Sequence, residues 1–164
     1  MTILVTGVHG FVGSNLVQYL APQNKIYGLD IVAPAKEGVE KTYSWNDLDT
    51  GNIPDVDAII HLAGKAHDTK NHTMEDEYFK INTGLTRKIY DYFLSSSTKK
   101  FVFFSTAKAV ADKVVGVLTE DVTPSPVGPY GESKIAAEQY ILSHPAASKS
   151  VPDSSEQCNK GVRL

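Results

Sequence analysis

The sequence predicts an open, doubly wound α/β fold built around a parallel β-sheet. Short apolar runs alternate with longer segments in which apolar residues recur every three or four positions, as strands alternate with crossover helices in such folds. The apolar runs are continuous, which is typical of strands buried on both faces. With 164 residues, 41% of them hydrophobic, the chain has the size and composition of one domain with a single core.

The predicted elements follow from the length and periodicity of these segments. Apolar and β-branched runs too short for helices predict strands, with a further short strand in a weakly patterned region: residues 2–6, 25–30, 42–45, 57–63 and 101–104. Helical spacing of apolar residues predicts helices over 12–20, 75–95 and 130–142. The polar stretch 146–160 predicts a surface loop, and residues 161–164 resemble the start of another strand.

Charge and composition exclude several classes of protein. A formal net charge of −3 gives no support for binding nucleic acid. No apolar run approaches the roughly 20 residues that cross a bilayer, and the first residues lack the basic region of a secretory signal. The single cysteine, Cys158, cannot form an internal disulfide. The sequence therefore predicts a cytoplasmic protein that binds neither membrane nor nucleic acid.

A glycine-rich turn follows the first predicted strand. Gly7, Gly10 and Gly13 stand three residues apart between this strand and the next helix. In a dinucleotide site, such glycines allow a tight turn, close approach of a pyrophosphate, and packing of the helix on the sheet. Asp30 ends the next strand, about 20 residues on, where a carboxylate accepts hydrogen bonds from the adenosine ribose. No Arg or Lys adjoins Asp30, which favours NAD over NADP.

A second constellation combines a phenol, an ammonium and a hydroxyl. Tyr130 and Lys134 are four residues apart and therefore share a helix face. A fixed cation beside a phenol favours the phenolate, which can accept a proton. Ser105 and Thr106 follow the strand 101–104, at the sheet edge where doubly wound folds place ligands. A hydroxyl there could bind a substrate oxygen beside the phenol.

Five ordered motifs together resemble the N-terminal part of an extended short-chain dehydrogenase/reductase, of the NAD-dependent nucleotide-sugar epimerase/dehydratase family. They are Thr6-Gly7-x-x-Gly10-Phe11-x-Gly13, Asp30, His61-Leu62-Ala63-Gly64, Asn82 in Ile-Asn-Thr-Gly, and Tyr130 with Lys134. The resemblance implies a Rossmann-like, NAD-binding domain over 1–164 and a nucleotide-sugar substrate, with UDP the expected nucleotide. It also implies a homodimer formed through the helices 75–95 and 130–142. The family's substrate domain is built mostly from C-terminal residues that 1–164 largely lacks.

The resemblance implies roles for individual residues. Tyr130 would be the general base, Lys134 would hold the nicotinamide ribose, and Thr106 would orient the reacting hydroxyl. The implied cofactor-binding residues are Gly7, His9, Gly10, Phe11, Val12, Gly13, Asp30, Ile31, Asp47, Leu48, Leu62, Ala63, Gly64, Lys65, Asn82, Tyr130 and Lys134. Asp47 and Leu48 resemble the segment that flanks the adenine. Asn82 has a second interpretation, in which its side chain caps local backbone.

The segment after residues 101–104 departs from the family pattern. One alignment places Thr106 at the catalytic hydroxyl position and another places Ala107 there; we prefer Thr106. A 4,6-dehydratase would carry Asp-Glu directly after the hydroxyl residue, so Ala107 and Lys108 disfavour dehydration. The resemblance therefore implies an epimerase, or a related reductase, that forms a transient keto sugar. A truncated or non-catalytic NAD-binding module and a reductase of non-sugar substrates stay open.

Other chemistries have less support. His61, His67 and His72 have no accompanying acidic or cysteine ligand pattern, so no metal site is predicted. The Gly-x-Ser-x-Gly turn of a serine hydrolase is absent from the sequence.

Overall fold

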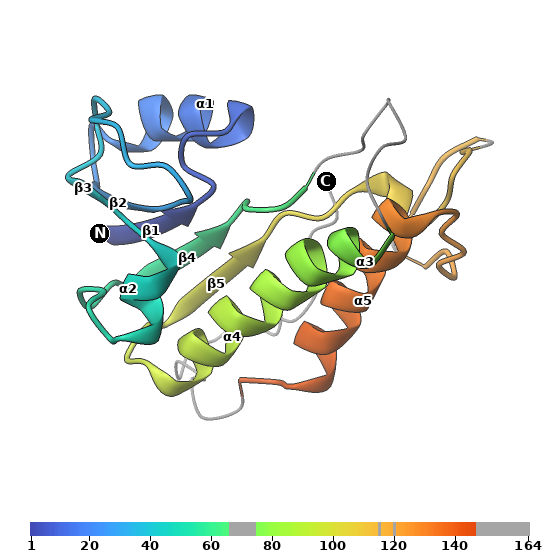
Figure 1. The fold of residues 1–164 in the computed structure, drawn as a ribbon. Coiled ribbons are helices and arrows are strands. Elements are labelled where there is room, and N and C mark those ends of the chain that lie inside the picture. The colour runs from blue at the N-terminus through green and yellow to red at the C-terminus, as the bar shows by residue number, and fades with distance from the viewer. Residues whose placement is uncertain (66–74, 115, 120, 147–164) are drawn as a thin grey trace, which may run out of the picture. The chain divides into compact units, whose positions relative to one another are not determined.

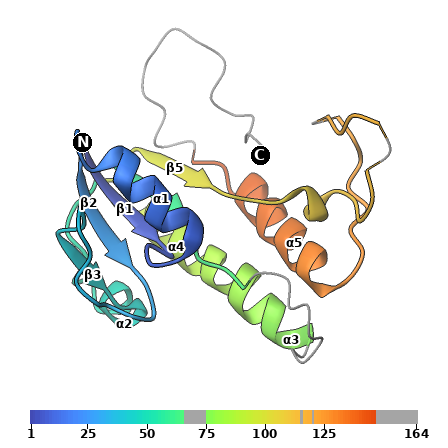
Figure 2. The same cartoon turned by 90° about the horizontal axis from the view of Figure 1, so that it is seen from above.

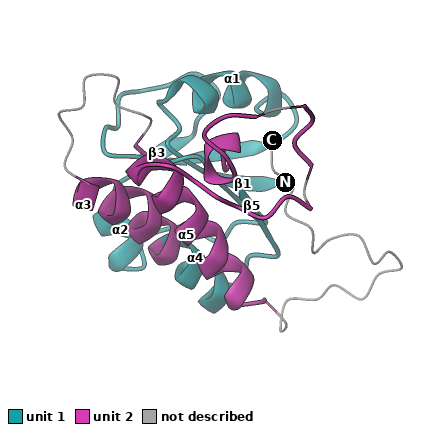
Figure 3. Cartoon of the chain, turned by 90° about the vertical axis from the view of Figure 1, so that its right-hand side faces the viewer, with its two compact units in different colours: residues 1–63, 89–103 teal, residues 64–88, 104–164 magenta. Residues whose placement is uncertain are grey.

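The structure is a computed structural model that describes residues 1–65, 75–114, 116–119 and 121–146. These residues form two compact units (Figure 3), residues 1–63 with 89–103 and residues 64–88 with the chain from 104 onward. Residues 147–160 of the predicted surface loop, the predicted strand start at 161–164, and His67, His72 and Cys158 lie outside the described residues.

The first unit contains a five-stranded sheet in the order β3-β2-β1-β4-β5 (Figure 1). All neighbouring strands are parallel. The strands are β1 (Thr2–Thr6), β2 (Lys25–Leu29), β3 (Lys41–Tyr43), β4 (Ala58–His61) and β5 (Lys100–Phe103). The predicted fold class and all five predicted strands are confirmed, with strand ends shifted by at most two residues.

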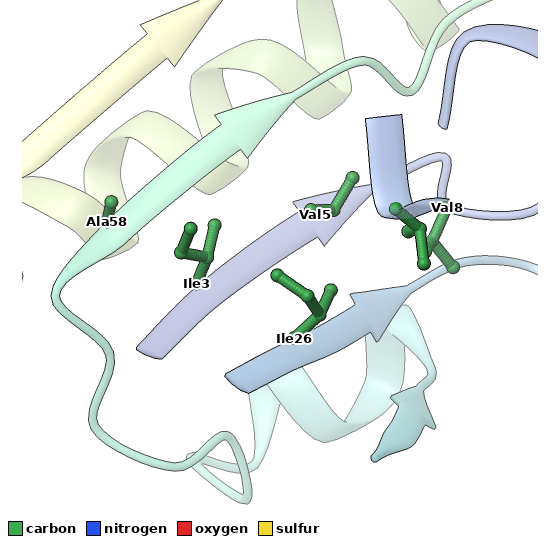
Figure 4. Close-up of a cluster of buried hydrophobic side chains, with 6 residues drawn as sticks. Ile3, Val5, Val8, Ile26 and Ala58 are labelled. Carbon is green, nitrogen blue, oxygen red and sulfur yellow. The ribbon is translucent and has the colours of Figure 1, made fainter. Parts of the chain in front are cut away.

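One face of the sheet is covered by α1 (Phe11–Leu20), which lies over β1 and β2 in Figure 2. The parallel register places Ile3 beside Ile26 on one side and Ala58 on the other, so these side chains share a face. Val5, Val8 and, from α1, Val17 complete this buried cluster, most of which is labelled in Figure 4. Each fully buried Val or Ile side chain contributes about 1.5–3 kcal/mol to folding, so this cluster holds α1 against the sheet.

The opposite face is covered by the second half of α4 (Leu85–Ser95). Leu4, Ile59 and Phe101 are in register on this face. The ring centroid of Phe101 lies 5.0 Å from that of Tyr90 and 5.3 Å from that of Phe93. Helices therefore pack on both faces of the sheet, as the continuous apolar strands predict.

A short helix that the sequence analysis did not predict, α2 (Trp45–Asp49), follows β3. Its N-terminus is a capping box. The Ser44 hydroxyl accepts a hydrogen bond from the Asp47 N–H, and the Asp47 carboxylate accepts one from the Ser44 N–H. The box satisfies main-chain groups that a helix of this length would otherwise leave exposed.

The second unit is mostly helical. It contains α3 (Glu75–Tyr78), the π-helical turn η1 (Phe79–Gly84), the start of α4, the 3-10 turn η2 (Ala107–Ala109) and α5 (Pro129–Ser143). None of the helices among the described residues combines the length and apolar character needed to cross a membrane.

The prediction of one regular helix over 75–95 is wrong in its middle, where η1 intervenes. Within this wider turn, the consecutive residues Asn82 and Thr83 both bond the same residue of α5. The Asn82 amide donates to Ser133 Oγ over 3.0 Å, and the Thr83 hydroxyl donates to the Ser133 carbonyl over 2.8 Å.

Candidate functional site

The glycine turn after β1 is closely packed. Gly7 has a φ of +67°, and a Cβ at this position would lie 2.9 Å from the Ala63 nitrogen. A Cβ at Gly13 would lie 2.9 Å from Val8 Cα and overlap the Gly7 carbonyl. Both positions therefore require glycine, the first for its conformation and the second for the approach of α1 to the turn.

The outer side of this turn is open. Gly10 is the N-cap of α1, and the first helical turn contains no acidic residue. Among the residues that the structure describes, and apart from the two chain neighbours of Gly10, a Cβ at this position would contact only the Gly7 carbonyl oxygen, at 3.2 Å. Exposed main-chain N–H groups and the positive end of a helix dipole suit a phosphate. Phe11 is 87% exposed and Val12 is also exposed.

Asp30 lies directly after β2 and is bonded to the glycine turn. One carboxylate oxygen accepts a hydrogen bond from the His9 N–H over 3.0 Å, and the other accepts one from the Ile31 N–H over 2.7 Å. The His9 ring is held in turn by Thr42 Oγ1, 3.1 Å from Nε2. The glycine turn and Asp30, both predicted to bind the cofactor, are thus brought together. Ile31, which follows Asp30, is exposed.

Thr6 holds the chain after β4 close to the same turn. Its buried hydroxyl oxygen accepts hydrogen bonds from the N–H groups of Leu62, over 3.1 Å, and Ala63, over 3.0 Å. The hydroxyl proton is then assigned to His61 Nδ1, 2.6 Å away, which places the ring proton on Nε2. His61 is fully buried between strands, in a structural role. Among the described residues, no group of three or more His, Cys, Asp or Glu side chains could hold a metal ion.

Asp47 and Leu48, predicted to flank adenine, belong to α2. The carboxylate of Asp47 accepts hydrogen bonds from the Ser44 hydroxyl and N–H, each 2.7 Å long. These two bonds lower the pKa of Asp47. Leu48 is buried. Both residues therefore stabilise α2, and their contact with adenine stays a prediction.

In the second unit, Asn82 is buried and clamps the backbone at Lys65. Its side-chain oxygen accepts from the Lys65 N–H over 2.7 Å, and its amide donates to the Lys65 carbonyl over 3.2 Å. A Cβ at Gly64 would lie 2.9 Å from the same oxygen. These contacts support the backbone-capping interpretation of Asn82. The Lys65 ammonium pairs with Glu77 at 2.9 Å.

The first turn of α5 packs on the segment that follows β5. Gly128 precedes the helix with a φ of +83°, and Pro129 is its first residue, a position that suits proline. A Cβ at Gly131 would overlap the Lys108 carbonyl and lie 3.1 Å from Pro126 Cβ. Tyr130, at this first turn, has its ring centroid 6.3 Å from that of Tyr78.

Lys134 lies one turn further along α5 and is only 7% exposed. Its ammonium donates a hydrogen bond to the Phe104 carbonyl over 2.8 Å. Burial lowers the pKa of Lys134 to about 8, although the nearby Glu138 carboxylate acts in the opposite direction. The Ser105 hydroxyl donates to Glu138. Next to it, Thr106 is the N-cap of η2, and its hydroxyl oxygen lies 3.3 Å from the Lys108 nitrogen.

Residues 3–152 match the profile described as the NAD dependent epimerase/dehydratase family. The chain belongs to this family. It is 30% identical over 151 residues to a UDP-glucose 4-epimerase of Halalkalibacterium halodurans, covering 86% of this chain and 45% of that one.

Solved structures of the epimerase/dehydratase family have the same fold. MoeE5 in complex with UDP-glucose and NAD superposes with a TM-score of 0.76 and 28% identity, covering 87% of this chain and 48% of that one. UDP-glucuronic acid 4-epimerase from Bacillus cereus in complex with NAD has a TM-score of 0.69 and 26% identity, with coverages of 85% and 51%. The chain thus spans about half the length of the relatives it matches.

Each unit of this family member carries part of the predicted site. The first holds the glycine turn, Asp30 and the chain at 61–63, and the second holds Thr106, Tyr130 and Lys134. Sequence reasoning named Ser105 only as a possible substrate-binding hydroxyl, and it missed Glu138 and the contact between the two. The four-residue spacing of Lys134 and Glu138 could have indicated that the carboxylate shares a helix face with the ammonium.

Proposed function

We propose that the intact protein is an NAD-dependent epimerase, or a closely related reductase, that acts on a UDP-linked sugar through a transient keto intermediate. One observation carries the proposal: Lys134, one turn after Tyr130 on α5, is anchored to the Phe104 carbonyl two residues before Thr106. The base, the cation and the hydroxyl therefore belong to segments joined by a direct hydrogen bond. Similarity to a UDP-glucose 4-epimerase supports the substrate class.

The residues of the glycine turn fit a dinucleotide. The open side of Gly10 leaves room for a pyrophosphate at the N-terminus of α1. A carboxylate has about four acceptor positions, so Asp30, which accepts two main-chain N–H groups, retains acceptors for ribose hydroxyls. When bound, NAD supplies a nicotinamide ring that accepts a hydride and returns it. The contacts expected from Leu62 to Lys65 are part of the proposal.

The proton-transfer step is assigned to the second unit. The phenolate oxygen of Tyr130 accepts the proton of the sugar hydroxyl while hydride leaves the same carbon, so the C–OH group becomes a C=O group. The positive charge of Lys134 favours the phenolate. Return of the hydride to either face of the carbonyl, with return of the proton from Tyr130, gives the original sugar or its epimer.

Thr106 is the proposed partner of the reacting hydroxyl. The Ser105 hydroxyl is already bonded to Glu138, and Ala107 has no polar side-chain atom. Thr106 is half-buried, and its hydroxyl can donate to a substrate oxygen while it accepts from the Lys108 N–H. This arrangement favours the alignment with Thr106 over the one with Ala107.

Dehydration has no support at the two positions after Thr106. A dehydratase of this family would be expected to place acidic side chains there, but Ala107 and Lys108 occupy them. The Lys108 ammonium pairs with Asp112 at 2.6 Å, one turn further on. Epimerisation or simple redox chemistry requires only the base, the hydroxyl and the cofactor.

The test is turnover by the intact protein. We expect it to bind NAD in calorimetry and to convert UDP-glucose or UDP-glucuronic acid to the 4-epimer, observed by proton NMR. Binding of NAD without turnover of either sugar would contradict the proposal and indicate a non-catalytic NAD-binding module. The homodimer proposed from the family resemblance is tested separately by sedimentation of the same preparation.

A further inference from the structure

Glu138 is a buried carboxylate outside the predicted site. It lies on α5 one turn after Lys134 and is 7% exposed. Its partner is the Ser105 hydroxyl, which donates to Oε1 of the carboxylate. A charge is seldom buried without partners because desolvation is costly. The burial of Glu138 therefore indicates that its hydrogen bond to Ser105 has a function.

Lys134 and Glu138 bond consecutive residues of one segment. The Lys134 ammonium binds the Phe104 carbonyl over 2.8 Å, and the Glu138 carboxylate binds the Ser105 hydroxyl. The next residue is Thr106, whose backbone is extended and which begins η2. Two contacts from successive turns of a rigid helix thus fix the chain immediately before the hydroxyl assigned to the substrate.

Lys134 and Glu138, whose contacts with Phe104 and Ser105 are called the clamp below, also interact electrostatically. Glu138 favours the charged form of Lys134 and opposes the effect of burial. On the facing segment, the Phe104 carbonyl and the Ser105 hydroxyl that bond this pair are both uncharged. The Glu138 carboxylate thus acts on the charge of Lys134 as well as on the position of Ser105.

We infer that Glu138 is a positioning residue, which with Lys134 clamps Phe104 and Ser105 and thereby sets Thr106 for its bond to the substrate hydroxyl. This inference rests on the proposed function. It assigns Ser105 and Glu138 a shared role, the positioning of Thr106, which requires no contact with cofactor or substrate. Loss of the clamp is expected to slow the chemical step more than it weakens substrate binding.

Two variants of the intact protein separate the hydrogen bond from the charge. Ser105→Ala removes the bond and keeps the carboxylate, whereas Glu138→Gln keeps an acceptor for Ser105 and removes the charge. We expect Ser105→Ala to lower kcat about tenfold, with KM changed less than about twofold. Glu138→Gln, which keeps an acceptor for the Ser105 hydroxyl, is expected to lower kcat less than Ser105→Ala does. Gln139→Ala, at an exposed neighbouring position of α5, is the matched control.

Two NMR signals test the clamp without turnover. The Thr106 amide is expected to shift in Ser105→Ala and to stay near its wild-type position in Glu138→Gln. The Lys134 13Cε signal is expected to titrate at lower pH in Glu138→Gln than in wild type. If the variants showed these responses but the wild-type protein turned over no UDP-sugar, the proposed function would be refuted and the clamp would stand.

The positioning role is overturned by either of two results. One is wild-type kcat in Ser105→Ala. The other is an unchanged Thr106 amide in both Ser105→Ala and Glu138→Ala. Ser105→Ala deletes a single oxygen atom, so it keeps the test decisive if Glu138→Ala fails to fold.

Discussion

The Lys134 ammonium donates a hydrogen bond to the main-chain carbonyl of Phe104, 2.8 Å away. This contact joins the helix that carries Tyr130 to the segment that carries Thr106. Because the ammonium is buried, its pKa is lowered to about 8. The lysine whose positive charge is proposed to favour the phenolate therefore loses that charge at a pH that experiments can reach.

Stability is expected to depend on pH through Lys134. Its folded pKa of about 8 lies below the ordinary value of 10.5, so the unfolded chain binds more protons between these values. The contribution of Lys134 to the free energy of unfolding therefore rises from pH 8 to 10.5 and is constant below 8.

Urea unfolding at several pH values tests this, with Lys134→Met as the control. The difference in unfolding free energy between wild type and variant is expected to move in favour of wild type above pH 8. The same difference at pH 7 and pH 10 would contradict the lowered pKa.

Two glycines of the turn are expected to have separable effects. Ala at Gly13 would overlap the Gly7 carbonyl and crowd Val8, so Gly13→Ala is expected to destabilise the fold by about 2 kcal/mol or more. Gly10 has a φ of −70° and is exposed, and among the described residues a Cβ there would meet only the Gly7 carbonyl oxygen, at 3.2 Å. Gly10→Ala is therefore expected to cost about 1 kcal/mol or less.

Calorimetry with NAD completes that comparison. A methyl group at Gly10 stands where the pyrophosphate is proposed to approach, so Gly10→Ala is expected to weaken NAD binding at least about tenfold while the fold is kept. NAD affinity equal to that of wild type in folded Gly10→Ala would show that the phosphates bind elsewhere.

The Thr6 hydroxyl is expected to stabilise the first unit. Val at this position has the same shape but removes the hydroxyl that bonds the Ala63 N–H and His61 Nδ1. Each unsatisfied buried group costs about 1–3 kcal/mol, so Thr6→Val is expected to lose about 2–4 kcal/mol. Thr6→Ser retains the hydroxyl and should recover most of it. Equal urea midpoints for the two variants would argue against this account.

The fold was predictable where one physical signal dominates. Continuous apolar runs identify buried parallel strands, and the glycines of the turn are required by close contacts to Ala63 and Val8. The helix α2 was missed because it has only five residues, too few to show a period. Its signal is the Ser44–Asp47 capping box, which is a local hydrogen-bonding pattern.

The residues of the candidate site were proposed from their spacing in the sequence, which does not reveal their contacts. Apolar periodicity does not reveal the wider turn of η1, in which Asn82 and Thr83 both bond Ser133. The contact of Ser105 with Glu138 joins residues 33 positions apart. Such a pair is formed only when the chain folds, so a motif that names Tyr130 and Lys134 gives no indication of it.

Removal of the Tyr130 hydroxyl tests the central claim most directly. The intact protein and its Tyr130→Phe variant would be compared for NAD-dependent turnover of UDP-glucose and UDP-glucuronic acid. Tyr140→Phe, further along α5, serves as the control. If Tyr130 is the general base, turnover falls by about 100-fold or more in Tyr130→Phe, while NAD binding is kept. Turnover within about tenfold of wild type would contradict the assignment of Tyr130 as the base.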